Sequence, residues 1–191
     1  MNNAAIMPGI FADPVATDDD LDALTFRTNA EGVYFVTKYA LPFLLRDAAA
    51  VKEDPFERTV VFMGSAAGWL AEPEDGNGML AYHATKAAVN GLVVHLHQSF
   101  DAPAPEGSMA HVVRSGRVLG RVASADPGFV ATELGRETLP PGVDDGEAYA
   151  ASKPGFGAVS VEEGADTPLW LVLADTVESG KAYFKRQVHS F

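Results

Sequence analysis

Apolar and polar residues follow one another along this chain in two different periodicities. After the run Thr17-Asp18-Asp19-Asp20, which suits a helix N-cap and first turn, apolar positions recur at roughly helical spacing and predict a helix over residues 19–50. The run from Thr59 to Ser65 reads instead as a strand covered on both faces. Further along, the pattern predicts a helix over 80–100, a strand over 117–125, a helix over 161–173 and a strand over 180–184. This order of elements indicates an α/β fold.

The residues best suited to acid/base catalysis lie where the second predicted helix begins, in the stretch Ala81-Tyr82-His83-Ala84-Thr85-Lys86. Tyr82 and Lys86 are four residues apart, so both project from one face of the helix, one turn apart. A nearby ammonium favours the phenolate form of a tyrosine, which brings the hydroxyl closer to acid/base work at neutral pH. Ser65 ends the preceding strand, and open α/β sheets place their ligands at the carboxyl ends of strands. We therefore expect Ser65, Tyr82 and Lys86 to meet at one site.

A strand-end Ser followed by Tyr-x-x-x-Lys resembles the signature of the short-chain dehydrogenase/reductase family. Four further matches follow the family's order, over nearly the whole chain: Asn2-Asn3-Ala4, Asn29, Asp126-Pro127-Gly128 with Thr132, and Val161-Glu162-Glu163-Gly164-Ala165. The last elements are most similar to carbonyl-reductase-like members. The resemblance implies a single domain over residues 1–191, a partial Rossmann-like doubly wound parallel sheet equivalent to the C-terminal half of the family's fold.

The resemblance also implies roles for individual residues. Hydride transfer would interconvert a small carbonyl compound and its alcohol with NADP or NAD, NADP being slightly preferred, and with no metal. The implied catalytic residues are Asn29, Ser65, Tyr82 and Lys86. The implied cofactor-binding residues are Asn2, Asn3, Ala4, Tyr82, Lys86, Pro127, Gly128 and Thr132. Taken alone, a mid-helix Asn such as Asn29 would be expected to face solvent.

In the family, a Gly-rich turn that receives the cofactor pyrophosphate precedes the Asn-Asn-Ala element. Here that element follows Met1 directly, and no other glycines in the chain offer a substitute. Two interpretations remain open: an oxidoreductase, or a non-catalytic relative that acts as a binding or scaffold protein or is inactive. Without the family's fourth strand, the strand 59–65 should have one unpaired edge, so the chain alone should either be marginal and association-prone or pair that edge with another chain. A homodimer through helices 19–50 and 80–100 is the expected partner arrangement.

Composition narrows the class of protein further. The 191 residues carry a formal net charge of −12, which argues against nucleic-acid or anionic-membrane partners. There is no Cys, so disulfides and thiolate metal sites are excluded. His95 and His97 face different sides of their predicted helix, which argues against a metal site there. No signal peptide or membrane span is predicted, and we expect a cytoplasmic protein.

Overall fold

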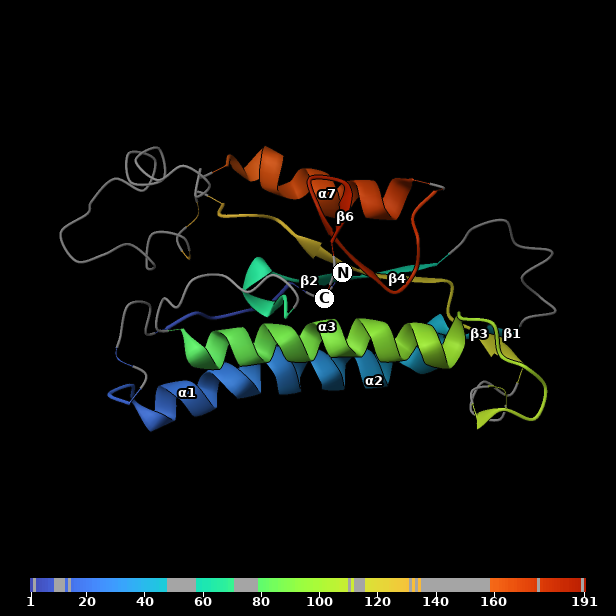
Figure 1. The fold of residues 1–191 in the computed structure, drawn as a ribbon, viewed down its shortest axis with the longest axis horizontal. Coiled ribbons are helices and arrows are strands. Elements are labelled where there is room, and N and C mark those ends of the chain that lie inside the picture. Colours follow the sequence, from blue (N-terminus) through green and yellow to red (C-terminus); the bar gives the residue numbers. More distant parts are fainter. Residues whose placement is uncertain are drawn as a thin grey trace.

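A four-stranded sheet forms the centre of the molecule (Figure 1). The computed structural model describes residues 1, 3–8, 13, 15–47, 58–70, 79–109, 111, 116–130, 132, 134, 159–174, 176–189 and 191. The sheet order is β2-β4-β5-β6, with β2 at Thr59–Met63, β4 at Arg121–Asp126, β5 at Lys181–Phe184 and β6 at Gln187–His189. The pairs β2–β4 and β4–β5 are parallel, and β5–β6 is antiparallel. The α/β fold and its parallel strands are confirmed.

Helices cover both faces of this sheet, as the uninterrupted apolar strands predicted. In Figure 1, α3 (Leu80–Phe100) and the helical residues 19–44 lie along one face, and α7 (Val161–Leu173) lies on the other. Alternate residues of β2 divide between the two layers: Phe62 packs with Val89 and Val93 of α3, and Val61 packs with Leu171 of α7. The core therefore has two halves, and β2 contributes a fully buried side chain to each.

The first predicted helix is shorter than expected and has an irregular centre. It consists of α1 (Asp19–Phe26), a π-helical segment η1 (Arg27–Gly32) and α2 (Val33–Leu44), and the short strand β1 (Arg46–Asp47) follows. The prediction that it reaches residue 50 was wrong. Leu45 adopts an extended backbone, and β1 pairs antiparallel with β3 (Arg117–Val118). That pairing partner is more than sixty residues away, so local periodicity could not reveal it.

Two differences in the later strands have a backbone cause. The predicted strand 117–125 is split into β3 and β4 at Gly120, whose φ of +100° and close approach to the Arg58 carbonyl suit glycine. The strand β6 was not predicted. Its hairpin turns at Lys185 and Arg186, both with positive φ, whereas the usual sequence signal for such a turn is Asn-Gly or Asp-Gly.

In the described part of the chain, β2 lies at one edge of the sheet, with β4 as its only strand neighbour. Large apolar side chains are exposed along α1 and α2: Leu21, Leu24, Phe26, Tyr34, Phe35, Val36, Tyr39 and Phe43.

Within the described residues, none of the helices has the length and apolar character needed to cross a bilayer. Residues 135–158 lie outside the described residues, as does Asn2.

Candidate active site

Ser65 stands where β2 ends and a single turn of 3-10 helix, η3 (Ala66–Gly68), begins. Its extended backbone makes it the N-cap of that turn, and its Oγ accepts a hydrogen bond from Ala67 N at 3.2 Å. The turn packs directly onto α3, because a Cβ on Gly68 would lie 2.5 Å from the backbone carbon of Lys86. Ser65 is thus held next to the helix that carries Tyr82 and Lys86.

Tyr82 and Lys86 lie together on the buried side of α3. Tyr82 is 8% exposed and packs with Ala67 of η3, Met79 and Met7. The Lys86 Nζ lies 5.5 Å from the centre of the Tyr82 ring and donates to the Met63 carbonyl at 2.9 Å. Burial lowers the pKa of Lys86 to about 8, and the negative charge of Asp126 acts in the opposite direction. At neutral pH the site therefore holds a largely protonated ammonium beside a phenol ring.

Asn29 lies inside the π-helical segment and is 1% exposed, so the expectation for an isolated mid-helix Asn, a solvent-facing side chain, does not hold. Its amide pairs with the backbone of Ile6 in both directions: Oδ1 accepts from Ile6 N at 2.8 Å, and Nδ2 donates to Ile6 O at 2.7 Å. Nδ2 also lies 3.3 Å from Thr85 Oγ1 on α3. Asn29 therefore binds the N-terminal segment at Ile6 and contacts Thr85 of α3, which lies in the helical turn between Tyr82 and Lys86.

The turn after β4 is organised by a buried carboxylate. Asp126 is 6% exposed; its Oδ2 accepts from Ala66 N at 2.6 Å and its Oδ1 accepts from Gly128 N at 2.7 Å. The pKa of Asp126 is raised above its ordinary value by burial, and these two N–H groups and the charges of Lys86 and His189 offset only part of that effect. Gly128 has a φ of +74°, which glycine adopts without strain.

The remaining predicted cofactor-binding residues are less closely connected to this group. Asn3 and Ala4 are exposed, in the segment that Asn29 holds at Ile6. Thr132 is also exposed, and its Oγ1 lies 3.4 Å from the Val130 carbonyl oxygen. Pro127 lines a pocket at the end of β4. The structure thus brings Asn29, Ser65, Tyr82, Lys86 and the Pro127-Gly128 turn to the carboxyl ends of the strands, and leaves Thr132, Asn3 and Ala4 at the surface.

Solved structures were found with the same arrangement of elements. The carbonyl reductase Sniffer of D. melanogaster superposes with a TM-score of 0.69 at 20% identity, over 100% of this chain and 64% of that chain. An NADPH-bound carbonyl reductase from chicken fatty liver gives 0.65 at 19% identity, over 100% and 61%. A short-chain dehydrogenase/reductase family protein gives 0.63 at 24% identity, over 96% and 63%. The chain has part of the short-chain dehydrogenase/reductase fold, as predicted.

The chain spans less than two thirds of the length of these structures. No family model matches the sequence, and no curated protein does. At such low identity it is the fold that the likeness shows. The implied residue roles remain predictions.

Two buried polar residues of the site were not predicted. Asn90 donates from Nδ2 to the Gly68 carbonyl at 2.9 Å and accepts from Ser124 Oγ at 3.1 Å, so it joins η3 and β4 to α3. It lies four residues after Lys86, as Lys86 does after Tyr82, and this polar stripe on an apolar helix was a usable signal. Asp126 was noticed only as part of a turn motif, because its partners are distant in sequence.

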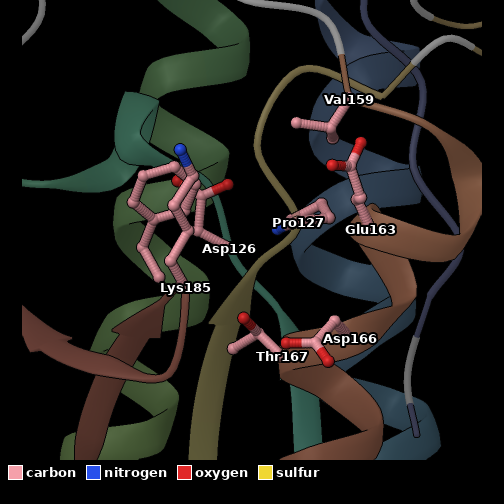
Figure 2. Close-up of a pocket in the computed structure, with 8 residues that line it drawn as sticks. Asp126, Pro127, Val159, Glu163, Asp166, Thr167 and Lys185 are labelled. Atoms are coloured by element: carbon pink, nitrogen blue, oxygen red, sulfur yellow. The ribbon is translucent and has the colours of Figure 1, made fainter.

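Beside Asp126 there is a pocket of about 260 Å³ between the end of β4, α7 and the β5–β6 turn (Figure 2). Glu163, Asp166 and Thr167 come from α7, and Lys185 comes from the hairpin turn. Nearby, the Trp69 ring stacks on His189 with centroids 4.5 Å apart. Among the described residues there is no group of three or more acidic or His side chains suited to a metal ion.

The residues present suit one end of a nicotinamide dinucleotide. Gly128 supplies a left-handed turn after β4 on which the Phe184 ring packs closely, with 3.2 Å between a ring carbon and the position of a Cβ, and Lys86 supplies a buried cation. For the pyrophosphate, the described residues contain no Gly-rich turn between a strand and a helix N-terminus. The fit is therefore with the nicotinamide and its ribose.

Proposed function

We propose that this chain carries the catalytic part of an NAD(P)-dependent oxidoreductase of the short-chain dehydrogenase/reductase family, which interconverts a small carbonyl compound and its alcohol. The proposal rests on the position of Lys86 relative to Tyr82. The Lys86 Nζ lies 5.5 Å from the centre of the Tyr82 ring, one helical turn away, and Tyr82 packs with Ala67 and Met79. When bound, the nicotinamide would supply or accept the hydride. The proteins with this fold named above include an NADPH-bound carbonyl reductase.

The proposed proton chemistry belongs to Tyr82. Its hydroxyl would give a proton to the substrate oxygen in reduction and take one in oxidation, and such general acid/base help is typically worth about 10²- to 10⁴-fold in rate. The Ser65 hydroxyl, held by the N-cap of η3, would hydrogen-bond the same oxygen. Both groups act where negative charge develops, so fixed positions matter.

Lys86 would act through its charge. A protonated Lys86 favours ionisation of Tyr82, and an ammonium has three N–H groups, one of which donates to Met63 O. Its pKa of about 8 keeps it mostly protonated at neutral pH. The cofactor's ribose hydroxyls would be further acceptors for this ammonium, and Pro127-Gly128, Thr132, Asn3 and Ala4 are proposed to line the nicotinamide side. Asn29 would support the proton relay from its π-helical position.

We further propose that two copies associate through α1, α2 and α3. Exposed aromatic side chains support this proposal. Tyr34, Phe35 and Tyr39 on α2 make edge and stacked ring contacts, and Lys38 Nζ lies 5.9 Å and 5.8 Å from the centroids of the Phe35 and Tyr39 rings. Phe43, one turn beyond Tyr39, is 80% exposed. Apolar surface of this kind is usually covered by a partner.

The function is tested with the purified chain and the variant Tyr82→Phe. Reduced NADPH and NADH are titrated while tryptophan fluorescence is recorded, since Trp69 follows η3 directly. Oxidation of the cofactor is then followed with a panel of small aldehydes and ketones. We expect Tyr82→Phe to lower turnover by about 10² or more while leaving the circular dichroism spectrum unchanged. Equal turnover in the two proteins would exclude Tyr82 as the acid/base.

A second candidate function, a non-catalytic binding or scaffold protein, is favoured by the absence of a pyrophosphate-binding turn from the described residues. It predicts no saturable response to either reduced cofactor and no turnover with any carbonyl compound. The same titration therefore separates the two functions.

A further inference from the structure

Asp126 connects three parts of the site that lie far apart in the sequence. Its two carboxylate oxygens accept from Ala66 N, directly after Ser65, and from Gly128 N, in the turn after β4. Both oxygens are thereby used as acceptors, which suits the ionised form. At the same end of the sheet, Gly64 N donates to Ala125 O at 2.7 Å, so the two strands are joined up to the residues that precede Ser65 and Asp126.

The third part is Lys86. Its ammonium donates to Met63, which pairs in register with Ala125, the neighbour of Asp126. The charges of Lys86 and Asp126 stabilise one another. Asp126 also interacts with His189 of β6, while Glu163 and Asp166 of α7 and Lys185 of the hairpin turn line the pocket beside it. Asp166 is engaged with Arg186.

We infer that Asp126 is a positioning residue of this site: its carboxylate fixes the backbone after Ser65 against the Gly128 turn and places a negative charge opposite Lys86. The consequence for catalysis rests on the proposed function, since Asp126 would act through Ser65 and Lys86. The positioning itself does not depend on any activity.

The charge of Asp126 determines in which pH range Lys86 keeps its proton. Burial of Lys86 favours the neutral amine, and the Asp126 carboxylate offsets part of that effect. Removing the negative charge should therefore lower the pKa of Lys86 below its present value of about 8. A neutral Lys86 at pH 7 would no longer favour ionisation of Tyr82.

The test uses the full chain labelled with ¹³C at lysine Cε, and NMR spectra recorded across pH. The Lys86 signal is identified by its absence in Lys86→Met. In Asp126→Asn we expect the Lys86 titration to move to lower pH by about one pH unit, as for the loss of a close opposite charge. Asp126→Glu keeps the charge and should retain most of the original titration. Asp166→Asn, the same change in the same pocket, should leave it unaltered.

Amide hydrogen exchange tests the backbone part. The N–H groups of Ala66 and Gly128 should exchange faster in Asp126→Asn, by about tenfold for each hydrogen bond worth ~1.4 kcal/mol, and remain unchanged in Asp166→Asn. If Asp126→Asn does not fold, the wild-type chain decides: the Lys86 signal should respond in the acid range as Asp126 titrates. A Lys86 titration insensitive to Asp126 in both experiments would overturn the inference.

These readouts require no turnover, so they separate this inference from the proposed function. If turnover is found, its fall with rising pH, as Lys86 loses its proton, should move to lower pH together with the Lys86 titration in Asp126→Asn but not in Asp166→Asn. An inactive chain that shows the NMR shifts would refute the proposed function and leave the positioning role intact. An active chain without the shifts would do the reverse.

Discussion

The contact between η3 and α3 allows a sharp test of how Ser65 is held. Gly68 ends η3, and a Cβ built on it would lie 2.5 Å from Lys86 C, 2.7 Å from Lys86 O and 2.8 Å from Ala87 N. All three are backbone atoms of a long helix, so no side chain can rotate away. Gly91, on the same helix, has no atom within 4 Å of its Cβ position. The same substitution, Gly→Ala, should therefore have opposite effects at the two sites.

The expected changes in the free energy of unfolding follow from these Cβ distances. Ordinary carbon contacts lie at about 3.5–4.0 Å, so in Gly68→Ala η3 or α3 must move by roughly 1 Å. Overpacking costs typically ~1–3 kcal/mol, and the backbone on both sides places this case near ~3 kcal/mol. The movement also strains the hydrogen bond from Asn90 to Gly68 O. Gly91→Ala, in a helix interior, should instead raise the free energy of unfolding by about 0.5–1 kcal/mol.

The assay is urea and thermal unfolding of wild type, Gly68→Ala and Gly91→Ala, followed by circular dichroism and by tryptophan fluorescence. For a chain of this size, ~3 kcal/mol corresponds to a Tm lower by roughly 6–12 °C, with Gly91→Ala shifted upward by a few degrees. A Gly68→Ala protein as stable as wild type would mean that η3 does not pack on α3 as described. If both variants were destabilised, the loss of stability at Gly68 could not be assigned to the contact between η3 and α3.

Two further predictions concern the charge of Lys86 and the exposed aromatic face. The pKa of Lys86 is lowered from 10.5 to about 8, so the unfolded state binds more protons than the folded state between these pH values. The free energy of unfolding of wild type should therefore rise with pH relative to that of Lys86→Met, by about 3 kcal/mol across that window. Urea midpoints of the two proteins near neutral pH and near pH 10.5 measure this rise, and a difference that stays constant contradicts the prediction. Phe43 is an 80% exposed residue of α2, and Phe43→Glu should lower the fraction of dimer that light scattering measures at micromolar concentration. The control is Val15→Glu: Val15 is 94% exposed but precedes α1, so this variant should leave the dimer fraction unchanged. A wild-type protein that is monomeric would refute the proposed dimer.

Local periodicity was enough to predict the elements that are covered on one stripe or on both faces. The helix 80–100 and the helix 161–173 have the bounds expected, because each has a continuous apolar stripe and α7 begins at a Ser160–Glu163 capping box. The strand predicted over Thr59–Ser65 was found over Thr59–Met63, two residues shorter, because its apolar residues are covered on both faces of the sheet. Where a boundary depends on a distant partner, as at Leu45 before β1, the prediction was wrong.

The residue types of the site were likewise evident from spacing. Tyr82 and Lys86 share a helix face because they are four residues apart, and Ser65 follows an apolar strand; both facts are local. Asn29 was selected through resemblance, but its burial and its pairing with Ile6 come from the packing of two helices against the N-terminal segment.

By itself, the sequence determined the main helices and the buried strands, and which hydroxyl, phenol and ammonium groups lie at their ends, since these depend on contacts within a few residues. Only the tertiary structure decided that Asp126 accepts from Ala66 N, sixty residues away, and that its charge acts on Lys86. It also decided that Asn90 joins η3 to β4, and that Lys185 and Arg186 turn the chain into β6. These contacts depend on which strands become neighbours in the sheet, and that order is set by the packing of the whole core rather than by any one stretch of sequence.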